Sequence, residues 1–469
     1  MDKSKAIVLM RSLSVWELKA FEKFVASPFH NPNSSVFDLF TYLKQHYPLF
    51  NNKDISYSLL SCKVFGTKKP DVPRFRYTLT ELTRLLEKFY MQLSMAENDA
   101  AQKKLLSAEL FKRGIDKYFS QQISGTRKTT DAKKDITYYE NLVAWSELSY
   151  EFTSSRKNRQ PDSDLQNLSD NLDNFYLVKK IKYCCEILNR SNILGSKYEV
   201  PLLDPLLLYL NTNPHPTPLI SIYYQILLTI TDHTNENNFR KLKALLQKHQ
   251  HDITLKENRD IYAFAQNYCI RQLNTGNLHY LRELFEIYKV VLEEKIIFDN
   301  KQLSHADFKN ICAVSIRLNE LKWADEFILS HAKFLSPEFR KNSVNYNTAR
   351  LHFARHQFKP AIKLLTTVEF TDVFYHLDAK ALLLKIYFEN REYEPLYSLI
   401  NTFKVYLKRS KQLSDYQRTI YTNLLNKVRL LAQLHAGDKV FSDKIKQELN
   451  TELPTADVNW LKEKITEFM

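Results

Sequence analysis

Two histidines, His352 and His356, have the spacing in this sequence that best suits a metal site. Residues four apart lie one above the other on a helix, where two imidazoles can share a metal ion. The glutamate that follows the first histidine in the H-E-x-x-H zinc motif is replaced by Phe353, and no obvious third ligand lies nearby in the sequence. We therefore interpret the pair as polar side chains near a helix end, and we predict no metal and no cofactor.

Cysteine chemistry is a second option, because Cys184 and Cys185 follow a run of lysines in "KKIKYCCEILNR". Adjacent cysteines are poorly placed to bind one metal ion, and the pattern predicts an amphipathic helix with one or both thiols buried. The alternative is a reactive thiol, because Lys179, Lys180 and Lys182 would favour a thiolate in a partly exposed setting. The odd count of five cysteines and the lack of a C-x-x-C pair indicate reduced thiols.

The motifs of common enzymes are missing from this sequence. It contains no serine elbow of a hydrolase, no glycine-rich phosphate loop and no cluster of carboxylates. It has only six glycines in 469 residues, where roughly 7% would be usual. Glycine lets the backbone approach phosphates and form tight hairpins. Its scarcity disfavours Rossmann, P-loop and hairpin-rich folds, so we predict a nearly all-helical protein that is not an enzyme.

Basic residues are concentrated in the N-terminal third. The net charge is +14, and residues 1–160 carry 26 Lys and Arg against 17 Asp and Glu. Cations at the start of a helix oppose its dipole, so Arg74 and Arg76 gain nothing intrinsic from the helix expected there. Two hypotheses stay open: a solvated face, or a surface that contacts an anionic partner, including nucleic acid. The candidate contact residues are Lys68, Lys69, Arg74, Arg76, Arg127 and Lys128.

Neither hydrophobic stretch of note is long enough for a membrane. The N-terminal "MDKSKAIVLMRSLS" has an apolar run of five residues, too short for the core of a signal peptide. The segment "PLISIYYQILLTI" (218–230) is also short, whereas a membrane span needs about 20 apolar residues. Together with the reduced thiols, this predicts a cytoplasmic protein with no membrane partner.

Helix-period patterns run through most of the chain. Ser14 and Glu17 form a capping box that begins a helix, Pro28 ends it, and Asn33 caps the next helix. Longer helices are expected at 74–93, 97–122, 132–155 and 163–193. Five of the fifteen prolines lie between 195 and 218 and mark a boundary. We predict an N-terminal helical domain at 1–95, a long-helix connecting region at 96–200 and a helical solenoid at 219–469.

From residue 219 onward the pattern predicts antiparallel helix pairs. A polar break in each pair is followed by an apolar anchor at the start of the second helix. The anchors are Phe239, Leu278, Leu321, Phe358 and Tyr393, spaced 39, 43, 37 and 35 residues apart. Irregular periods of this size are typical of a solenoid in which each helical hairpin buries its apolar face against its neighbours.

One of these units, "YNTARLHFARHQFKPAIKLL", resembles a tetratricopeptide repeat in Ala349, Phe358 and Ala361. The same frame places Leu281, Ala324 and Leu396 at the position of Ala361, and Cys269, Cys312 and Leu384 at that of Ala349. The resemblance covers roughly residues 219–450 and is degenerate. It implies that the two helices of a pair approach closely there, and cysteine suits such a place as a small buried side chain.

A second resemblance lies near the N-terminus. The pattern "LS-x-x-E-L-K-x-F-x-K-F-(V/L)-x-SP-(F/Y)-x-N" is similar to the start of a family of uncharacterised bacterial helical proteins. The matching residues are Leu13, Ser14, Glu17, Leu18, Lys19, Phe21, Lys23, Phe24, Ser27, Pro28, Phe29 and Asn31. This likeness implies homology and supplies no function.

The tetratricopeptide resemblance also implies a groove lined by the first helix of each pair, which in that family binds extended peptides or helices. The frame projects Lys309, Tyr346, Arg350 and Lys385 towards this groove. Long cations beside an aromatic ring suit an acidic peptide or a C-terminus. The alternative is that these are ordinary exposed residues.

Together these patterns predict a non-enzymatic helical-repeat scaffold that binds a protein or peptide partner in the solenoid groove, an acidic partner being one option. The alternative is a nucleic-acid-associated protein that uses the basic N-terminal third. A hydrolase or metal enzyme of unfamiliar type is the third option.

Overall fold

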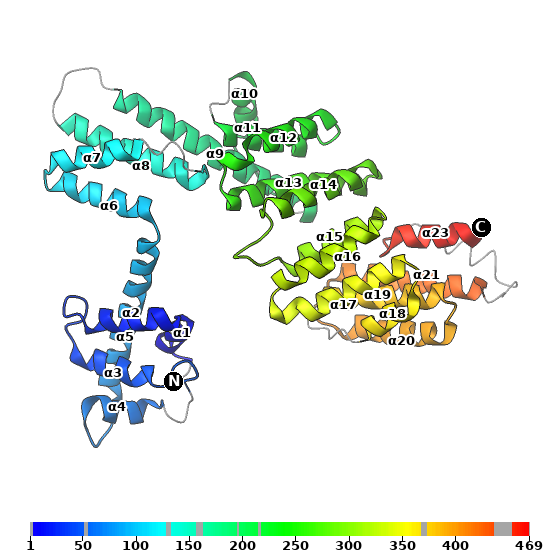
Figure 1. The fold of residues 1–469 in the computed structure, drawn as a ribbon, viewed down its shortest axis with the longest axis horizontal. Helices are drawn as coiled ribbons and strands as arrows, with labels where there is room; N and C mark the ends of the chain where they lie inside the picture. The colour runs from blue at the N-terminus through cyan, green and yellow to red at the C-terminus, as the bar shows by residue number, and fades with distance from the viewer. Residues whose placement is uncertain are drawn as a thin grey trace. The chain divides into compact units, whose positions relative to one another are not determined.

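The protein is all-helical in the parts that the structure describes (Figure 1). The computed structural model describes residues 3–50, 55–127, 133–155, 163–194, 197–213, 217–366, 373–435 and 453–468. Over these ranges the chain forms 22 α-helices and two short 3-10 helices, without a β-sheet. Helices that follow one another in sequence pack on one another. The predicted all-α fold is confirmed.

Contacts divide the chain into two compact units. The first comprises residues 1–132 and 136–176, and the second comprises residues 133–135 and 177–469. The division falls inside α9 (Asp164–Leu194), and the proline-rich residues 195–218 belong to the second unit. The domain ranges expected from the sequence stay a prediction.

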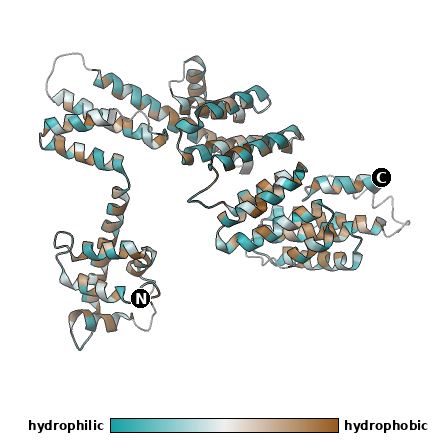
Figure 2. Cartoon of the chain, in the orientation of Figure 1, coloured by the Kyte–Doolittle hydropathy of each residue, from teal (hydrophilic) through white to brown (hydrophobic). Residues whose placement is uncertain are grey.

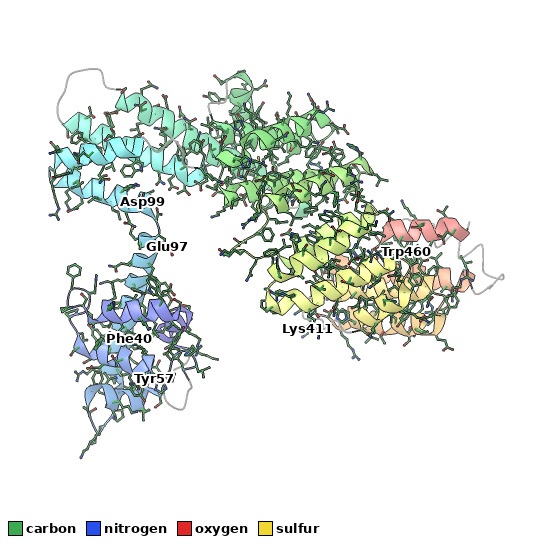
Figure 3. All side chains as sticks on the ribbon, viewed as in Figure 1. Phe40, Tyr57, Glu97, Asp99, Lys411 and Trp460 are labelled. Carbon is green, nitrogen blue, oxygen red and sulfur yellow. The ribbon has the colours of Figure 1, made fainter. Side chains whose placement is uncertain are left out.

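The long helix α5 organises the start of the first unit, because α1, α2, α3 and α4 all pack against it. Phe40, labelled in Figure 3, meets Phe21 edge to face with ring centroids 5.1 Å apart, and Tyr57 meets Phe75 at 5.7 Å. Such aromatic pairs stabilise a core beyond the area that they bury. The helices of this unit are α1 (Lys5–Ser12), α2 (Val15–Ala26), α3 (Ser34–Lys44), α4 (Tyr57–Phe65), α5 (Val72–Ala96), α6 (Asp99–Lys112), α7 (Asp116–Arg127), α8 (Ile136–Ser155) and the first part of α9.

The predicted capping box, helix end and second cap between residues 14 and 33 are confirmed. The Ser14 hydroxyl accepts the Glu17 amide at 3.2 Å, and the Glu17 carboxylate accepts the Ser14 amide at 2.6 Å. The helix ends at Ala26, just before Ser27 and Pro28, and Asn33 caps α3. The ring of His30 stacks on that of Phe24 with centroids 4.0 Å apart, which gives His30 a packing role.

The single helix predicted at 97–122 was wrong, because the chain forms α6 and α7 there. The break lies at Gly114, whose φ of 69° is in the left-handed region that favours glycine. The amide of Ile115 donates to the carbonyl of Leu110 and closes the end of α6. The helices predicted at 74–93, 132–155 and 163–193 are present with slightly different bounds, as α5, α8 and α9.

In the second unit, helices that follow one another in sequence pack on each other, among them α11 with α12, α13 with α14 and α17 with α18. Their arrangement as a solenoid stays a prediction. Leu321, Phe358 and Tyr393 begin the second helices of three pairs. First helices also pack on one another, α11 on α13, α15 on α17 and α17 on α19. The helices are the rest of α9, α10 (Leu203–Thr212), α11 (Pro218–Thr231), α12 (Glu236–His249), α13 (Leu255–Asn274), α14 (His279–Glu293), α15 (His305–Arg317), α16 (Leu321–His331), α17 (Pro337–Ala354), α18 (Phe358–Leu365), α19 (Val373–Glu389), α20 (Tyr393–Arg409), α21 (Asp415–His435) and α23 (Val458–Phe468).

The residues that the tetratricopeptide frame aligns with Ala349 and Ala361 are all buried, including Cys269 and Cys312. Burial raises the pKa of the Cys312 thiol to about 12, which keeps it protonated and unreactive. Cys184 and Cys185 are also buried, and burial raises the pKa of both thiols. The predicted helix and the predicted burial of the thiols are confirmed.

A buried polar network joins α9, α11 and α13. Lys182 donates to Glu257 at 3.0 Å and to Asp260 at 2.8 Å, and the Tyr223 hydroxyl donates to Glu257. Lys182 and Glu257 are each less than 10% exposed. Because a buried charge is stable only when it is paired, this network fixes the three helices relative to one another.

Within the described ranges, no helix is both long enough and apolar enough to cross a membrane. Figure 2 shows hydrophilic and hydrophobic residues interspersed along the helices, as expected for helices with one face in a core.

Replacing Ser14 with Ala removes the capping hydroxyl of α2 and should destabilise that helix by about 1 kcal/mol. We expect the backbone amides of α2 to exchange with deuterium about fivefold faster, measured by hydrogen–deuterium exchange and mass spectrometry. Ser34→Ala is the matched control, because Ser34 is exposed at the first position of α3 and its side chain makes no hydrogen bond with a described residue. Equal exchange in the two variants would contradict the capping role.

Candidate partner-binding site

The four predicted groove residues lie in one cluster on the first helices of three pairs, which we call the Arg350 cluster. Lys309 on α15 forms an ion pair with Asp378 on α19 at 2.8 Å. Lys385, also on α19, pairs at 2.9 Å with Asp457, which immediately precedes α23. Arg350 on α17 lies between them, with its guanidinium carbon 5.8 Å from the centre of the Tyr346 ring. The helical frame therefore selected residues that share one place in the fold.

Three residues of the cluster were missed by sequence reasoning: Asp378, Asp457 and Tyr421. The Tyr421 hydroxyl donates to the second oxygen of Asp378 at 3.0 Å. Asp378 precedes Lys385 by seven residues, so both lie on the same face of α19. That spacing could have indicated Asp378, whereas nothing local marks Tyr421 or Asp457.

The helix α23 is held in place by its own contacts with α19. The indole nitrogen of Trp460, labelled in Figure 3, donates to Glu389 at 2.9 Å. Lys464 forms an ion pair with the same carboxylate at 3.0 Å. Because these contacts anchor the first turns of α23, they also position Asp457 beside Lys385.

Charge is unevenly matched in the Arg350 cluster. Two of its three cations, Lys309 and Lys385, have a carboxylate within 3 Å. Arg350 is partly buried, and among the described residues its guanidinium has no ion pair or hydrogen bond. The hydroxyl of Tyr346, which is 5% exposed, likewise has no hydrogen-bond partner in the described part of the chain. The cluster therefore holds two adjacent donor groups that no described residue satisfies.

The electrostatics keep these donors protonated. Burial raises the pKa of the Tyr346 hydroxyl, so that it stays a donor at neutral pH. Burial, followed by the charge of Asp378, raises the pKa of Tyr421 in the same way. Burial opposes the charge on Arg350, yet its pKa is raised overall because Tyr346 and Asp378 lie close by. The arrangement can donate several hydrogen bonds to one anionic group.

The basic candidates of the N-terminal third lie around the start of α5. Lys68 and Lys69 are exposed in the loop between α4 and α5, and Arg74 and Arg76 are exposed on α5. The guanidinium carbon of Arg74 lies 4.2 Å from the Phe65 ring centre, and that of Arg76 lies 5.9 Å from Tyr57. Both arginines therefore pack on rings of α4. The side chain of Arg127, and Lys128 altogether, lie outside the described residues.

The prediction that His352 and His356 lie one above the other on a single helix was wrong. The helix α17 ends at Ala354, and His356 has a φ of 55° beyond that end. His352 instead has its ring nitrogen 2.6 Å from the amide oxygen of Gln357. Among the described residues, no group of three or more His, Cys, Asp or Glu could hold a metal ion.

The chain matches no protein-family model, no curated protein and no solved structure. The chemistry of the Arg350 cluster therefore has to carry the functional argument.

Replacing Tyr421 with Phe removes a hydrogen bond to the charged Asp378 and should lower the free energy of unfolding by about 1.5 kcal/mol. Urea denaturation followed by circular dichroism measures this change. The matched control is Tyr397→Phe, because Tyr397 is also partly buried and its hydroxyl bonds to no described residue. A loss as large in the control would show that the ring environment, and not the bond to Asp378, is responsible.

Proposed function

We propose that this chain is a non-enzymatic helical-repeat protein that binds a carboxylate of a protein or peptide partner at Arg350. The observation that carries the proposal is the pair of unsatisfied donors, Arg350 and Tyr346, on the first helix of one pair. Arginine binds a carboxylate through two parallel hydrogen bonds, and a tyrosine hydroxyl beside it can supply a third.

The charge of the cluster favours a carboxylate over a phosphate. Lys309, Arg350 and Lys385 carry three positive charges, and Asp378 and Asp457 carry two negative ones. The local excess is therefore a single positive charge, which a carboxylate neutralises. A dianionic phosphate would leave an excess negative charge next to two partly buried aspartates. Charges of the same sign repel strongly when they lie close together in a partly buried site.

The architecture supports a polypeptide partner. Helix pairs that pack in sequence place their first helices side by side, and α15, α17 and α19 do so around Arg350. Residues from successive pairs can then contact successive positions of one partner chain. The resemblance to tetratricopeptide repeats agrees with this use of the first helices.

Arg350→Gln should abolish binding of peptides that carry a free C-terminal carboxylate, and Arg350→Lys should weaken it at least tenfold, because lysine lacks the planar fork. The probe is an array of synthetic peptides, each present with a free and with an amidated C-terminus, and the readout is bound full-length protein. Lys341→Gln is the matched control, since Lys341 is exposed on the same helix. We expect binding that amidation removes and that the control keeps.

Two results would overturn the proposal. One is peptide binding that survives both amidation and Arg350→Gln. The other is an array on which the unaltered protein binds no peptide with a free C-terminus.

A second candidate function, association with nucleic acid, is supported by Lys68, Lys69, Arg74 and Arg76. None of these side chains forms an ion pair with a described residue, so their charges are available to phosphates.

If this second function is correct, Lys68→Glu with Lys69→Glu should weaken binding to a short DNA or RNA duplex at least tenfold at low salt. Affinity should also fall steeply as salt increases. Fluorescence anisotropy measures both effects. Lys408→Glu with Lys411→Glu is the control, because it changes the charge equally at exposed positions of the second unit (Figure 3). The absence of duplex binding at low salt would exclude this function.

A further inference from the structure

Two adjoining cavities form a groove between α9 and α13, which we call the amide groove. Their volumes are about 230 and about 430 Å³, and both are lined by Asn189, Phe264 and Asn267. The end of α11 contributes Thr229 and Ile230 to the larger cavity. All of these residues belong to the second unit. The groove is separate in sequence from the Arg350 cluster and has a different chemistry.

Four asparagines give the groove its character: Asn189 and Asn192 from α9, and Asn267 and Asn274 from α13. The spacings of three and seven residues place each pair on one face of its helix. None of the four side-chain amides makes a hydrogen bond with any residue that the structure describes. Each amide therefore presents a free donor and a free acceptor to the groove.

Other amides of the same helix pairs are used within the protein. The Gln225 side chain donates to the Asn238 carbonyl at 2.9 Å, and Gln272 donates to the His233 carbonyl at 2.6 Å. Asn258 donates to the Gln250 carbonyl at 2.6 Å. These three amides stabilise the fold, whereas the four amides in the groove bond to no described residue.

The lining of the groove favours an uncharged ligand. Its charged residues are Glu186 and Asp260 against Arg190 and Arg271, so their charges balance. Asp260 is paired with Lys182, and Arg271 donates to the Ile230 carbonyl at 3.3 Å. A phosphate or a nucleic acid would find no excess of positive charge here. The aromatic rings in the lining, Phe264 and Tyr268, are less than 10% exposed and offer no open face for stacking a sugar or a base.

The dimensions suit an extended polypeptide. Along α13 the lining runs from Asp260 to Asn274, fourteen residues or about 21 Å of helix. Six residues of extended chain span about the same length. Ile270 is 38% exposed at the larger cavity and offers an apolar contact for a side chain of such a segment.

We propose that the amide groove binds an extended, uncharged segment of a partner polypeptide through its backbone. An asparagine amide matches a peptide group, because each has one N–H direction and one C=O direction in a plane. Four such amides along the groove can bond to backbone groups whatever the side chains of the partner are. The groove therefore provides affinity with little sequence selectivity, and it does not depend on a carboxylate at Arg350.

The test uses the full-length protein and a library of hexapeptides that are acetylated at the N-terminus and amidated at the C-terminus. Such peptides carry no terminal charge. For the hexapeptides that bind, N-methylation of the central backbone amides should weaken binding at least tenfold while keeping every side chain. Asn189→Ala with Asn267→Ala should weaken it by a similar factor. Fluorescence anisotropy with labelled peptides measures the affinities.

The same double variant separates binding from folding. The side-chain amides of Asn189 and Asn267 bond to no described residue, and alanine is the better helix former. The melting temperature of the double variant should therefore stay equal or increase. Asn237→Ala is the matched control, because Asn237 is exposed on α12 outside the groove. Arg350→Gln should leave the capped peptides bound, so that failure of one site is distinguishable from failure of the other.

Three results would overturn the proposal: selection of no capped hexapeptide, binding that tolerates backbone N-methylation, or equal affinities of the Asn189→Ala/Asn267→Ala and Asn237→Ala variants.

Discussion

The polar interior of the C-terminal helices depends on the interactions of one carboxylate, that of Asp378. It accepts from Lys309 on α15 and from Tyr421 on α21, and it is itself on α19. Most packing in this unit joins neighbours in sequence, whereas Asp378 links first helices from pairs that are further apart. Because Asp378 pairs with Lys309, Arg350 is left as the cation of this cluster that has no carboxylate partner among the described residues. One aspartate thus holds these helices together and determines which cation of the cluster stays unpaired.

The Arg350 cluster and the amide groove differ in which chemical groups of a partner they can recognise. At Arg350 a guanidinium and a hydroxyl, both short of partners, lie among groups whose charges are otherwise balanced, so an anion of single charge is favoured. In the amide groove the charges balance and the free groups are neutral donors and acceptors. A charged site selects a particular group on a partner, whereas an amide surface contacts any extended backbone. The two proposals are compatible with one kind of partner, because a polypeptide carries both a carboxylate and an extended backbone.

Local patterns were sufficient to predict much of this fold. Scarce glycine, capping residues and apolar periodicity depend on neighbours a few residues away, and they predicted the helices and the Ser14 box. The burial of Cys269 and Cys312 was implied by the resemblance to tetratricopeptide repeats. The helix break at Gly114 was missed, because one glycine within a helical pattern does not show whether it will adopt a left-handed conformation. The frame found Lys309, Tyr346, Arg350 and Lys385, but not their partners. Lys309 and Asp378 are 69 residues apart, and only the folded chain shows which carboxylate meets which cation.

Helix propensity gives an independent reason to regard the amide groove as more than a surface feature. Asparagine is a poor helix former, and each one inside a helix costs up to about 0.7 kcal/mol relative to alanine. Where Asn258 carries this cost, its amide bonds to the backbone and returns stability. Asn189 and Asn267 lie inside α9 and α13 and make no such bond in the described structure. The helix-propensity cost of these two asparagines is therefore not offset within the described structure, and a partner bound in the amide groove would offset it.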